Sequence, residues 1–183
     1  MKLNITTKDA LAYLLLICLV LLSHLFPSPL FVYVLPLYLL LTPVVLRRKI
    51  RCIFSLRNMA EGLLVSAVVL IPFYFIMSAG RQFHLLPLSA LLGQFALVSL
   101  PEEVYFRGYL QESVGNTLKG VLVVSLLFAA AHLPAFWFYK DPSALLTFFP
   151  SLVMGGLYMR TSNVLPPLLF HFLANVVYQG FMI

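Results

Sequence analysis

Residues 121–138, VLVVSLLFAAAHLPAFWF, decide the fold class, because they contain a single ionisable side chain, His132. A helix needs about 20 consecutive, mostly apolar residues to cross the hydrocarbon core of a bilayer. Other apolar runs of similar length lie along the chain, at residues 10–26, 30–46, 60–79, 85–100, 144–159 and 164–183. The sequence therefore predicts an all-α, polytopic transmembrane helix bundle with about seven spans, within a range of six to eight.

The composition excludes a soluble protein. Of the 183 residues, 62% are hydrophobic and 10% are charged, and the mean hydropathy is +0.99. Soluble domains carry about 25% charged residues, so this chain has too few to cover a water-exposed surface. Disordered, collagenous and disulfide-rich classes are excluded as well. We expect one integrated membrane domain, in which residues 1–80 form N-terminal spans with a basic loop and no recognised motif, and residues 81–183 form the helix core that carries the polar motifs.

The formal net charge of +6 sets membrane orientation and gives no sign of nucleic acid binding, since no aromatic-interleaved basic face accompanies it. With the N-terminus in the cytoplasm, the outer loops hold only Arg81 and Lys140. Nine basic residues then fall in inner loops, namely Lys2, Lys8, Arg47, Arg48, Lys49, Arg51, Arg57, Lys119 and Arg160. By the positive-inside rule, this bias predicts a cytoplasmic N-terminus and an outer C-terminus. The first span should stay uncleaved, because no small-residue cleavage site follows its apolar run.

A cluster of charges, Glu102, Glu103 and Arg107, directly follows the fourth apolar run. At mid-membrane their insertion costs on the order of 9 kcal/mol, so we expect compensation or function. Glu103 and Arg107 have the spacing and order of a helical ion pair, which leaves Glu102 as the available carboxylate. Pro101 favours a kink or break at Leu100. The alternative is an ordinary ion pair at a helix end on the membrane surface.

Two further helices carry polar side chains inside apolar runs. Phe128 and His132 are four residues apart and share one face of the fifth run. In the last run, His171 and Asn175 have the same spacing. Lipid cannot satisfy these donors and acceptors, so both faces should turn into the bundle. Each pair alone could be an interhelical hydrogen-bonding contact, but together with Glu102 they predict one convergent polar site.

Two kinds of chemistry fit this set of residues. Glu102 can take a proton from water that His132 orients, while His171 and Asn175 donate hydrogen bonds to an oxyanion. Alternatively, Glu102, His132 and His171 are a possible zinc ligand set. No HExxH motif is present, and the spacing alone does not choose between the two.

Three motifs occur in order: EExxxR in PEEVYFRGYL, FxxxH in FAAAH and HxxxN in HFLAN. This pattern resembles the CAAX protease and bacteriocin-processing family of glutamate-dependent intramembrane endopeptidases, which includes the type II prenyl-protein proteases. The resemblance implies that Glu102 and His132 activate water and that His171 and Asn175 form the oxyanion site. It also implies structural support from Glu103 and Arg107, with which we group Phe128. A metal-free site without cofactor is favoured over zinc.

The resemblance implies a multi-pass enzyme of a prokaryotic cell membrane, embedded in the lipid bilayer. Its substrate would be a membrane-anchored protein or peptide, cleaved near its C-terminus in a lipidated tail or a sorting helix. One alternative is a non-catalytic relative that acts in bacteriocin immunity or as a scaffold, but such a relative should have lost a motif residue. A small transporter would predict repeat symmetry, which the sequence lacks.

Overall fold

The computed structural model describes residues 5–182, and within them every regular element is helical. Six of the predicted runs form α1 (Thr7–Leu25), α2 (Phe31–Val45), α3 (Leu56–Met77), α7 (Leu118–Tyr139), α8 (Ser143–Leu146) with α9 (Phe148–Thr161), and α10 (Leu165–Gly180). The remaining run forms a continuous helical series of α4 (Leu88–Gly93), η1 (Gln94–Ser99), α5 (Leu100–Glu103), η2 (Val104–Gln111) and α6 (Glu112–Val114). The predicted all-α helix bundle is confirmed.

Three helices, α1, α3 and α7, are each long and apolar enough to cross a membrane. α2 is apolar but shorter. In the most apolar windows of α1 and α3 only 11% of the residues are buried inside the protein, so most of these two helices is left to contact lipid. The chain is thus a membrane protein, while the count of about seven spans stays a prediction.

The predicted break at Leu100 does not occur. Ser99 and Leu100 both have right-handed helical dihedrals, so the helix continues through Pro101. Two π-helical segments, η1 and η2, flank the short α5 instead. Proline has no backbone N–H and cannot donate to the carbonyl four residues earlier. A π-helical turn uses a wider hydrogen-bond spacing, so the π-helical segment before Pro101 accommodates the missing donor. π-Helical turns are often found at functional sites.

The helix starts follow from local capping. Thr6 and Asp9 form a capping box at the start of α1, in which each side chain binds the other's backbone N–H. The side chains of Ser55 and Thr117 accept backbone hydrogen bonds at the starts of α3 and α7. These caps fix where three long apolar helices begin.

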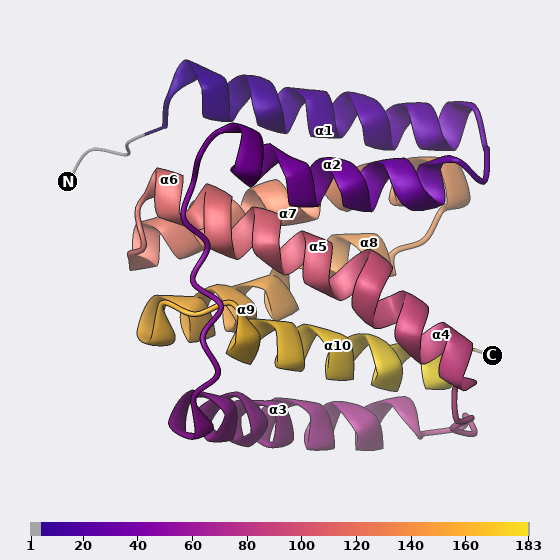
Figure 1. The fold of residues 1–183 in the computed structure, drawn as a ribbon. Helices are drawn as coiled ribbons and strands as arrows, with labels where there is room; N and C mark the ends of the chain where they lie inside the picture. Colours follow the sequence, from indigo (N-terminus) through magenta and orange to yellow (C-terminus); the bar gives the residue numbers. More distant parts are fainter. Residues whose placement is uncertain (1–4, 183) are drawn as a thin grey trace.

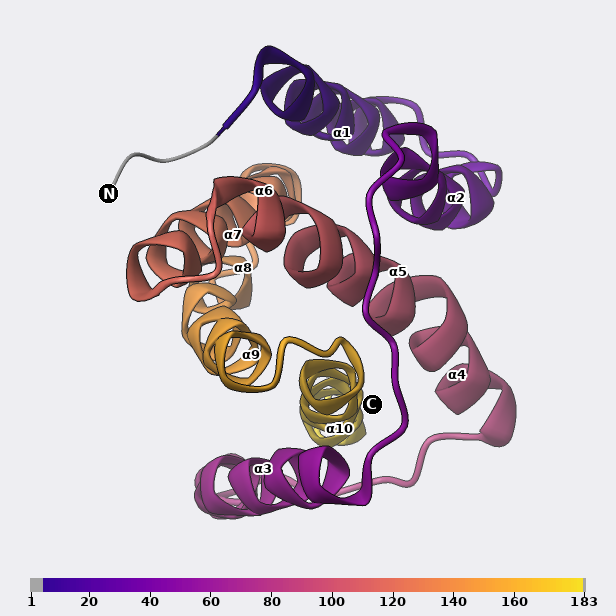
Figure 2. The same ribbon diagram turned by 60° about the vertical axis from the view of Figure 1, so that its left-hand side comes forward.

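The central position in the bundle belongs to the α4–α6 series. Figure 2 shows it crossing the molecule between the α1–α2 pair on one side and α9, α10 and α3 on the other. All residues from Tyr105 to Gln111 are buried, because helices surround this segment. The charged motif of the sequence therefore lies at the centre of the protein.

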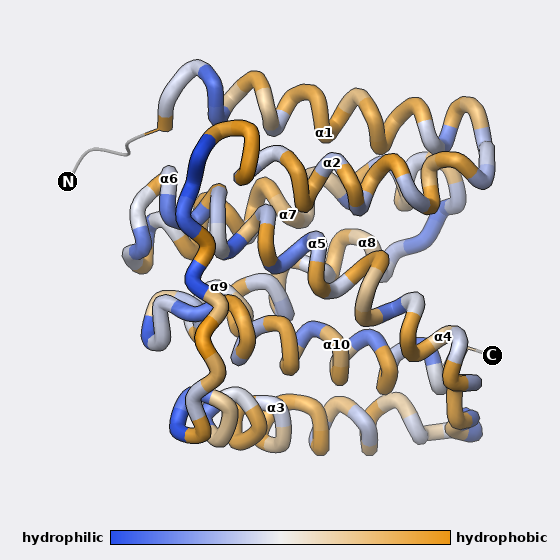
Figure 3. The backbone as a smooth tube through the Cα atoms, viewed as in Figure 1, coloured by the Kyte–Doolittle hydropathy of each residue, from blue (hydrophilic) through white to orange (hydrophobic). Residues whose placement is uncertain are grey.

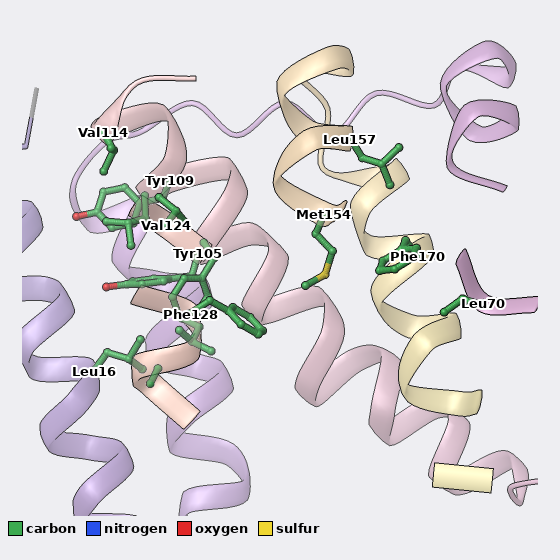
Figure 4. Packing of buried hydrophobic residues seen from close by; sticks show 14 residues of the cluster. Leu16, Leu70, Tyr105, Tyr109, Val114, Val124, Phe128, Met154, Leu157 and Phe170 are labelled. Carbon is green, nitrogen blue, oxygen red and sulfur yellow. The ribbon is translucent and has the colours of Figure 1, made fainter. Parts of the chain in front are cut away.

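Aromatic and aliphatic side chains pack on both sides of this central helix. Figure 4 shows two groups, one beside α1 and one contributed by α9 and α10. The first group includes Leu16, Tyr105, Tyr109, Val124 and Phe128, and the second Met154, Leu157 and Phe170. The packing holds η2 against its neighbours and thereby fixes the positions of the charged side chains on it.

Hydrophilic segments gather mostly at one end of the bundle. The start of α1, the segment after α2, the α6–α7 turn and the α9–α10 turn lie at the left end in Figures 1 and 3. These segments carry the basic residues that the sequence assigns to the cytoplasm, apart from Lys2, which lies outside the described residues. Which side of the membrane this end faces stays a prediction.

Candidate active site

Glu103 joins two helices at the centre of the bundle. Its Oε1 accepts a hydrogen bond from Nδ1 of His171 on α10 at 2.9 Å. Its Oε2 accepts one from Nε of Arg107 at 3.2 Å, which is the ion pair predicted from their spacing. The side chains of Glu103 and Arg107 are both 0% exposed. An unpaired charge at this depth is strongly destabilising, so the pair is held together by mutual compensation.

Arg107 extends the network to two more helices. Its Nη2 donates to Oγ of Ser151 on α9 at 3.0 Å, and its guanidinium carbon lies 5.3 Å from the ring centroid of Phe128 on α7. The cation–π contact compensates part of the buried charge. Sequence reasoning missed Ser151, although a polar residue within the apolar run 144–159 was the signal that could have found it.

Glu102 is the less constrained of the two glutamates. Its side chain is 19% exposed, and its Oε2 lies 3.7 Å from Nε2 of His171. That oxygen is buried and has no hydrogen-bond partner within the protein. The ring of His171 thus lies between two carboxylates, with Nδ1 on Glu103 and Nε2 facing Glu102. A carboxylate that lacks internal hydrogen bonds is available to a water molecule or a substrate group.

His132 is oriented by its own helix. Its Nδ1 lies 2.8 Å from the backbone carbonyl of Phe128, and a carbonyl can only accept, so Nδ1 carries a proton. The two rings pack with centroids 4.6 Å apart. The Phe128 ring also lies near His171, with 6.0 Å between the ring centroids. This arrangement leaves Nε2 of His132 as the nitrogen for chemistry.

Glu102 and His132 line the same cavity, which has a volume of about 370 Å³. Its walls are mostly apolar and come from α1, α2, η1, α5, η2 and α7. Ser23 and His24 of α1 also line it, and sequence reasoning did not single them out. Two adjacent polar residues at the end of the apolar run 10–26 were the available signal. A carboxylate and an imidazole beside an apolar cavity are suited to acid–base chemistry on an apolar substrate.

Asn175 lies one helical turn beyond His171 on α10 and is half-buried. No hydrogen bond of its side chain is found among residues 5–182. The structure thus brings Glu102, Glu103, Arg107, His171 and Phe128 into one cluster, and His132 joins it through Phe128 and the cavity. Asn175 shares the helix of His171, but within residues 5–182 no hydrogen bond joins its side chain to the rest.

The possible zinc set does not fit this geometry. Within residues 5–182, no three His, Cys, Asp or Glu side chains lie close enough to hold a metal ion. Zinc sites need three or four converging ligands, so the site without a metal stays the proposal.

A comparison with protein-family models identifies one match. The model of the Rce1-like type II CAAX prenyl endopeptidases matches residues 84–177, a little over half of the chain. The matched region extends from the loop before α4 into α10 and contains every candidate site residue. No curated protein and no solved structure matches the chain.

Proposed function

Since the chain belongs to the Rce1-like family of type II CAAX prenyl endopeptidases, a family of proteases, we propose that it is an intramembrane endopeptidase. It hydrolyses a peptide bond near the C-terminus of a membrane-anchored protein or peptide, by means of water activated by Glu102 and His132. The observation that carries the proposal is the position of Glu102, which lines an apolar cavity together with His132 and has a buried oxygen without a partner.

In the first step a water molecule in the cavity lies between Glu102 and Nε2 of His132. The Glu102 carboxylate takes a proton from this water while the water oxygen attacks the carbonyl carbon of the peptide bond. His132 orients the water because its Nε2 accepts the second hydrogen bond of that water. Nε2 is free to accept since the ring proton is on Nδ1, which bonds to the Phe128 carbonyl. General bases of this kind typically contribute 10²- to 10⁴-fold to the rate.

Attack on the carbonyl places negative charge on its oxygen. Nε2–H of His171 and the amide of Asn175, one turn apart on α10, supply hydrogen bonds to this oxyanion. Glu103 stabilises the protonated imidazole through Nδ1 and fixes its orientation. When the tetrahedral intermediate collapses, the C–N bond breaks and Glu102 returns its proton to the leaving nitrogen. The products are a carboxylic acid and an amine, and Glu102 is again a carboxylate.

The cavity indicates the class of substrate. Its lining is mostly aliphatic and aromatic, with residues such as Leu35, Leu39 and Phe106, and it lies against α1 and α2, whose outer faces are apolar. An apolar segment in this cavity would meet mostly apolar walls beside Glu102. A lipidated tail and a C-terminal sorting helix both have this character.

The test compares protein C-termini in cells. Cells that lack the gene are complemented with the wild-type chain, with Glu102→Gln or with the control Glu61→Gln, which also removes one carboxylate but pairs with Arg160 far from the cavity. Membrane-protein C-termini are then mapped by mass spectrometry. We expect uncleaved C-termini in the deletion and Glu102→Gln cells, and cleavage restored by wild type and Glu61→Gln.

Two outcomes would contradict the proposal. Cleavage restored by Glu102→Gln would exclude Glu102 as the base. If deletion of the gene altered no C-terminus, the endopeptidase function would be wrong, and a non-catalytic role in immunity or as a scaffold would be favoured instead.

A further inference from the structure

A second cavity, of about 300 Å³, lies where α1 begins and α2 ends. It is lined by Lys8, Asp9, Val45, Leu46, Arg47 and Arg48. None of these residues lines the cavity that contains Glu102. The basic segment after α2 therefore does more than set membrane orientation, because its side chains surround a defined space.

The charge balance of this cavity favours an anion. Its one acidic residue, Asp9, is fully buried, and it already accepts hydrogen bonds from the Thr6 backbone N–H and hydroxyl. The Tyr109 hydroxyl donates to the same carboxylate at 2.8 Å, and Arg48 Nη2 does so at 3.2 Å. Asp9 is thus satisfied by the protein and leaves little negative charge facing the cavity.

Two of the three cations are left without an acidic partner. Lys8 and Arg47 are exposed and form no ion pair within residues 5–182. Arg47 also has a left-handed backbone, with φ of 53°, which costs about 1 to 2 kcal/mol for a residue other than glycine. Two backbone hydrogen bonds close the turn: the N–H of Arg47 donates to the Val44 carbonyl, and the N–H of Arg48 donates to the Pro43 carbonyl. The turn places Arg47 and Arg48 at the same cavity.

The surroundings of the cavity are apolar on the membrane side. Val44 and Val45 at the end of α2 are 67% and 74% exposed, and Leu11 on α1 is 60% exposed. Figure 3 shows the hydrophilic start of α1 beside the hydrophilic segment after α2, with hydrophobic helix continuing from each. A ligand that fits both surfaces has an anionic head and an apolar body.

We propose that this cavity binds the phosphate headgroup of an anionic phospholipid, with Lys8, Arg47 and Arg48 around the phosphate and the acyl chains along α1 and α2. Basic pockets between membrane helices are suited to such headgroups, because each Lys or Arg near an anionic membrane surface contributes about a fivefold gain in affinity. The site is joined to the helix that carries Glu102, since Asp9 bonds to both Arg48 and Tyr109. A bound lipid therefore also stabilises the packing of α1 on η2.

The test measures thermal unfolding of the full chain in detergent micelles with added phosphatidylglycerol, phosphatidylcholine or inorganic phosphate. A ligand that binds only the folded state raises the unfolding midpoint as its concentration rises. We expect phosphatidylglycerol to raise the midpoint, and phosphatidylcholine and phosphate to have little effect. In the double variant Lys8→Gln/Arg47→Gln the apparent affinity for phosphatidylglycerol should fall roughly 30-fold. Arg48 is left unchanged because it pairs with Asp9.

The matched control is Arg57→Gln/Lys119→Gln, which removes two exposed cations that line neither cavity. It should keep the response to phosphatidylglycerol. If the double variant is too unstable to measure, Lys8→Gln and Arg47→Gln alone should each lose about fivefold. An undiminished response in these variants, or an equal response to phosphatidylcholine, would overturn the site. An equal response to inorganic phosphate would show that the cavity binds free phosphate and would overturn the proposal of a lipid ligand.

Discussion

Glu102 and Glu103 are adjacent in the chain, yet the structure gives them different surroundings. About 100° of helical rotation separates neighbouring residues, so Glu103 faces Arg107 and His171 while Glu102 lines the apolar cavity. Both oxygens of Glu103 accept hydrogen bonds, whereas one oxygen of Glu102 is buried without a partner. Under the proposed function, Glu103 is a positioning residue and Glu102 is the one that reacts.

Replacing Glu103 should cost stability far more than replacing a surface glutamate. Glu103→Gln leaves the fully buried Arg107 without a directly bonded carboxylate, for which we expect a loss of about 3 to 5 kcal/mol in the free energy of unfolding. The control Glu61→Gln breaks the pair with Arg160, which is 71% exposed, and should cost less than about 1 kcal/mol. Denaturant unfolding in mixed micelles measures both, and similar losses would contradict the role of the buried pair.

Asn175 tests the oxyanion site separately from the fold, because its side chain forms no hydrogen bond within the described part of the chain. Under the proposed function, Asn175→Ala should lower kcat by about 10²- to 10³-fold, the usual effect of losing one oxyanion donor, with little change in KM. The free energy of unfolding should stay close to that of the wild type. Steady-state kinetics on a cleaved peptide would show this, and an unchanged kcat would remove Asn175 from the site.

At the scale of elements, α9 packs closely on α7 through a glycine. A Cβ at Gly155 would lie 2.8 Å from Cγ1 of Val121, so Gly155→Ala should force the helices apart and lower stability by about 1 to 3 kcal/mol. The next residue is the matched control, since a Cβ at Gly156 would meet nothing within 4 Å. Gly156→Ala should be neutral or stabilise by up to about 1 kcal/mol. Thermal unfolding of the two variants in detergent measures this difference. Equal unfolding midpoints would contradict the close packing of α9 on α7 at Gly155.

Helices were predictable from the sequence because apolar runs and capping residues are local signals. The run 121–138 falls within α7, and Thr117 caps that helix. Of the kink or break predicted at Leu100, the break was wrong, since a proline in isolation indicates either one. In the structure the helix continues there between two π-helical segments, with Pro101 itself buried. Tertiary packing of this kind leaves no mark in a short window of sequence.

At the scale of the whole molecule, the i,i+4 pairs predicted which side chains share a helix face but not which faces meet. The Glu103–Arg107 pair is such a local feature. The contacts of His171 with both glutamates, and of Arg107 with Ser151, join segments far apart in the chain. The same holds for Tyr109 with Asp9, which attaches α1 to the central helix. A single sequence contains no signal for such pairings, so the convergence was a hypothesis and the network itself was not foreseen.

The orientation of the bundle in the membrane is predicted from the placement of its basic residues, and it can be tested on the intact protein. The segments assigned to the cytoplasm lie at one end, and the α7–α8 connection, which contains Lys140, lies at the other. A phosphatase that is active only outside the cytoplasm should therefore be active when inserted after Lys140. Inserted at Asn116, in the α6–α7 turn, it should be inactive, while a fluorescent protein that matures only in the cytoplasm should show the reverse pattern. Because the N-terminal end carries most of the positive charge, an inverted result would mean that the positive-inside rule fails for this protein.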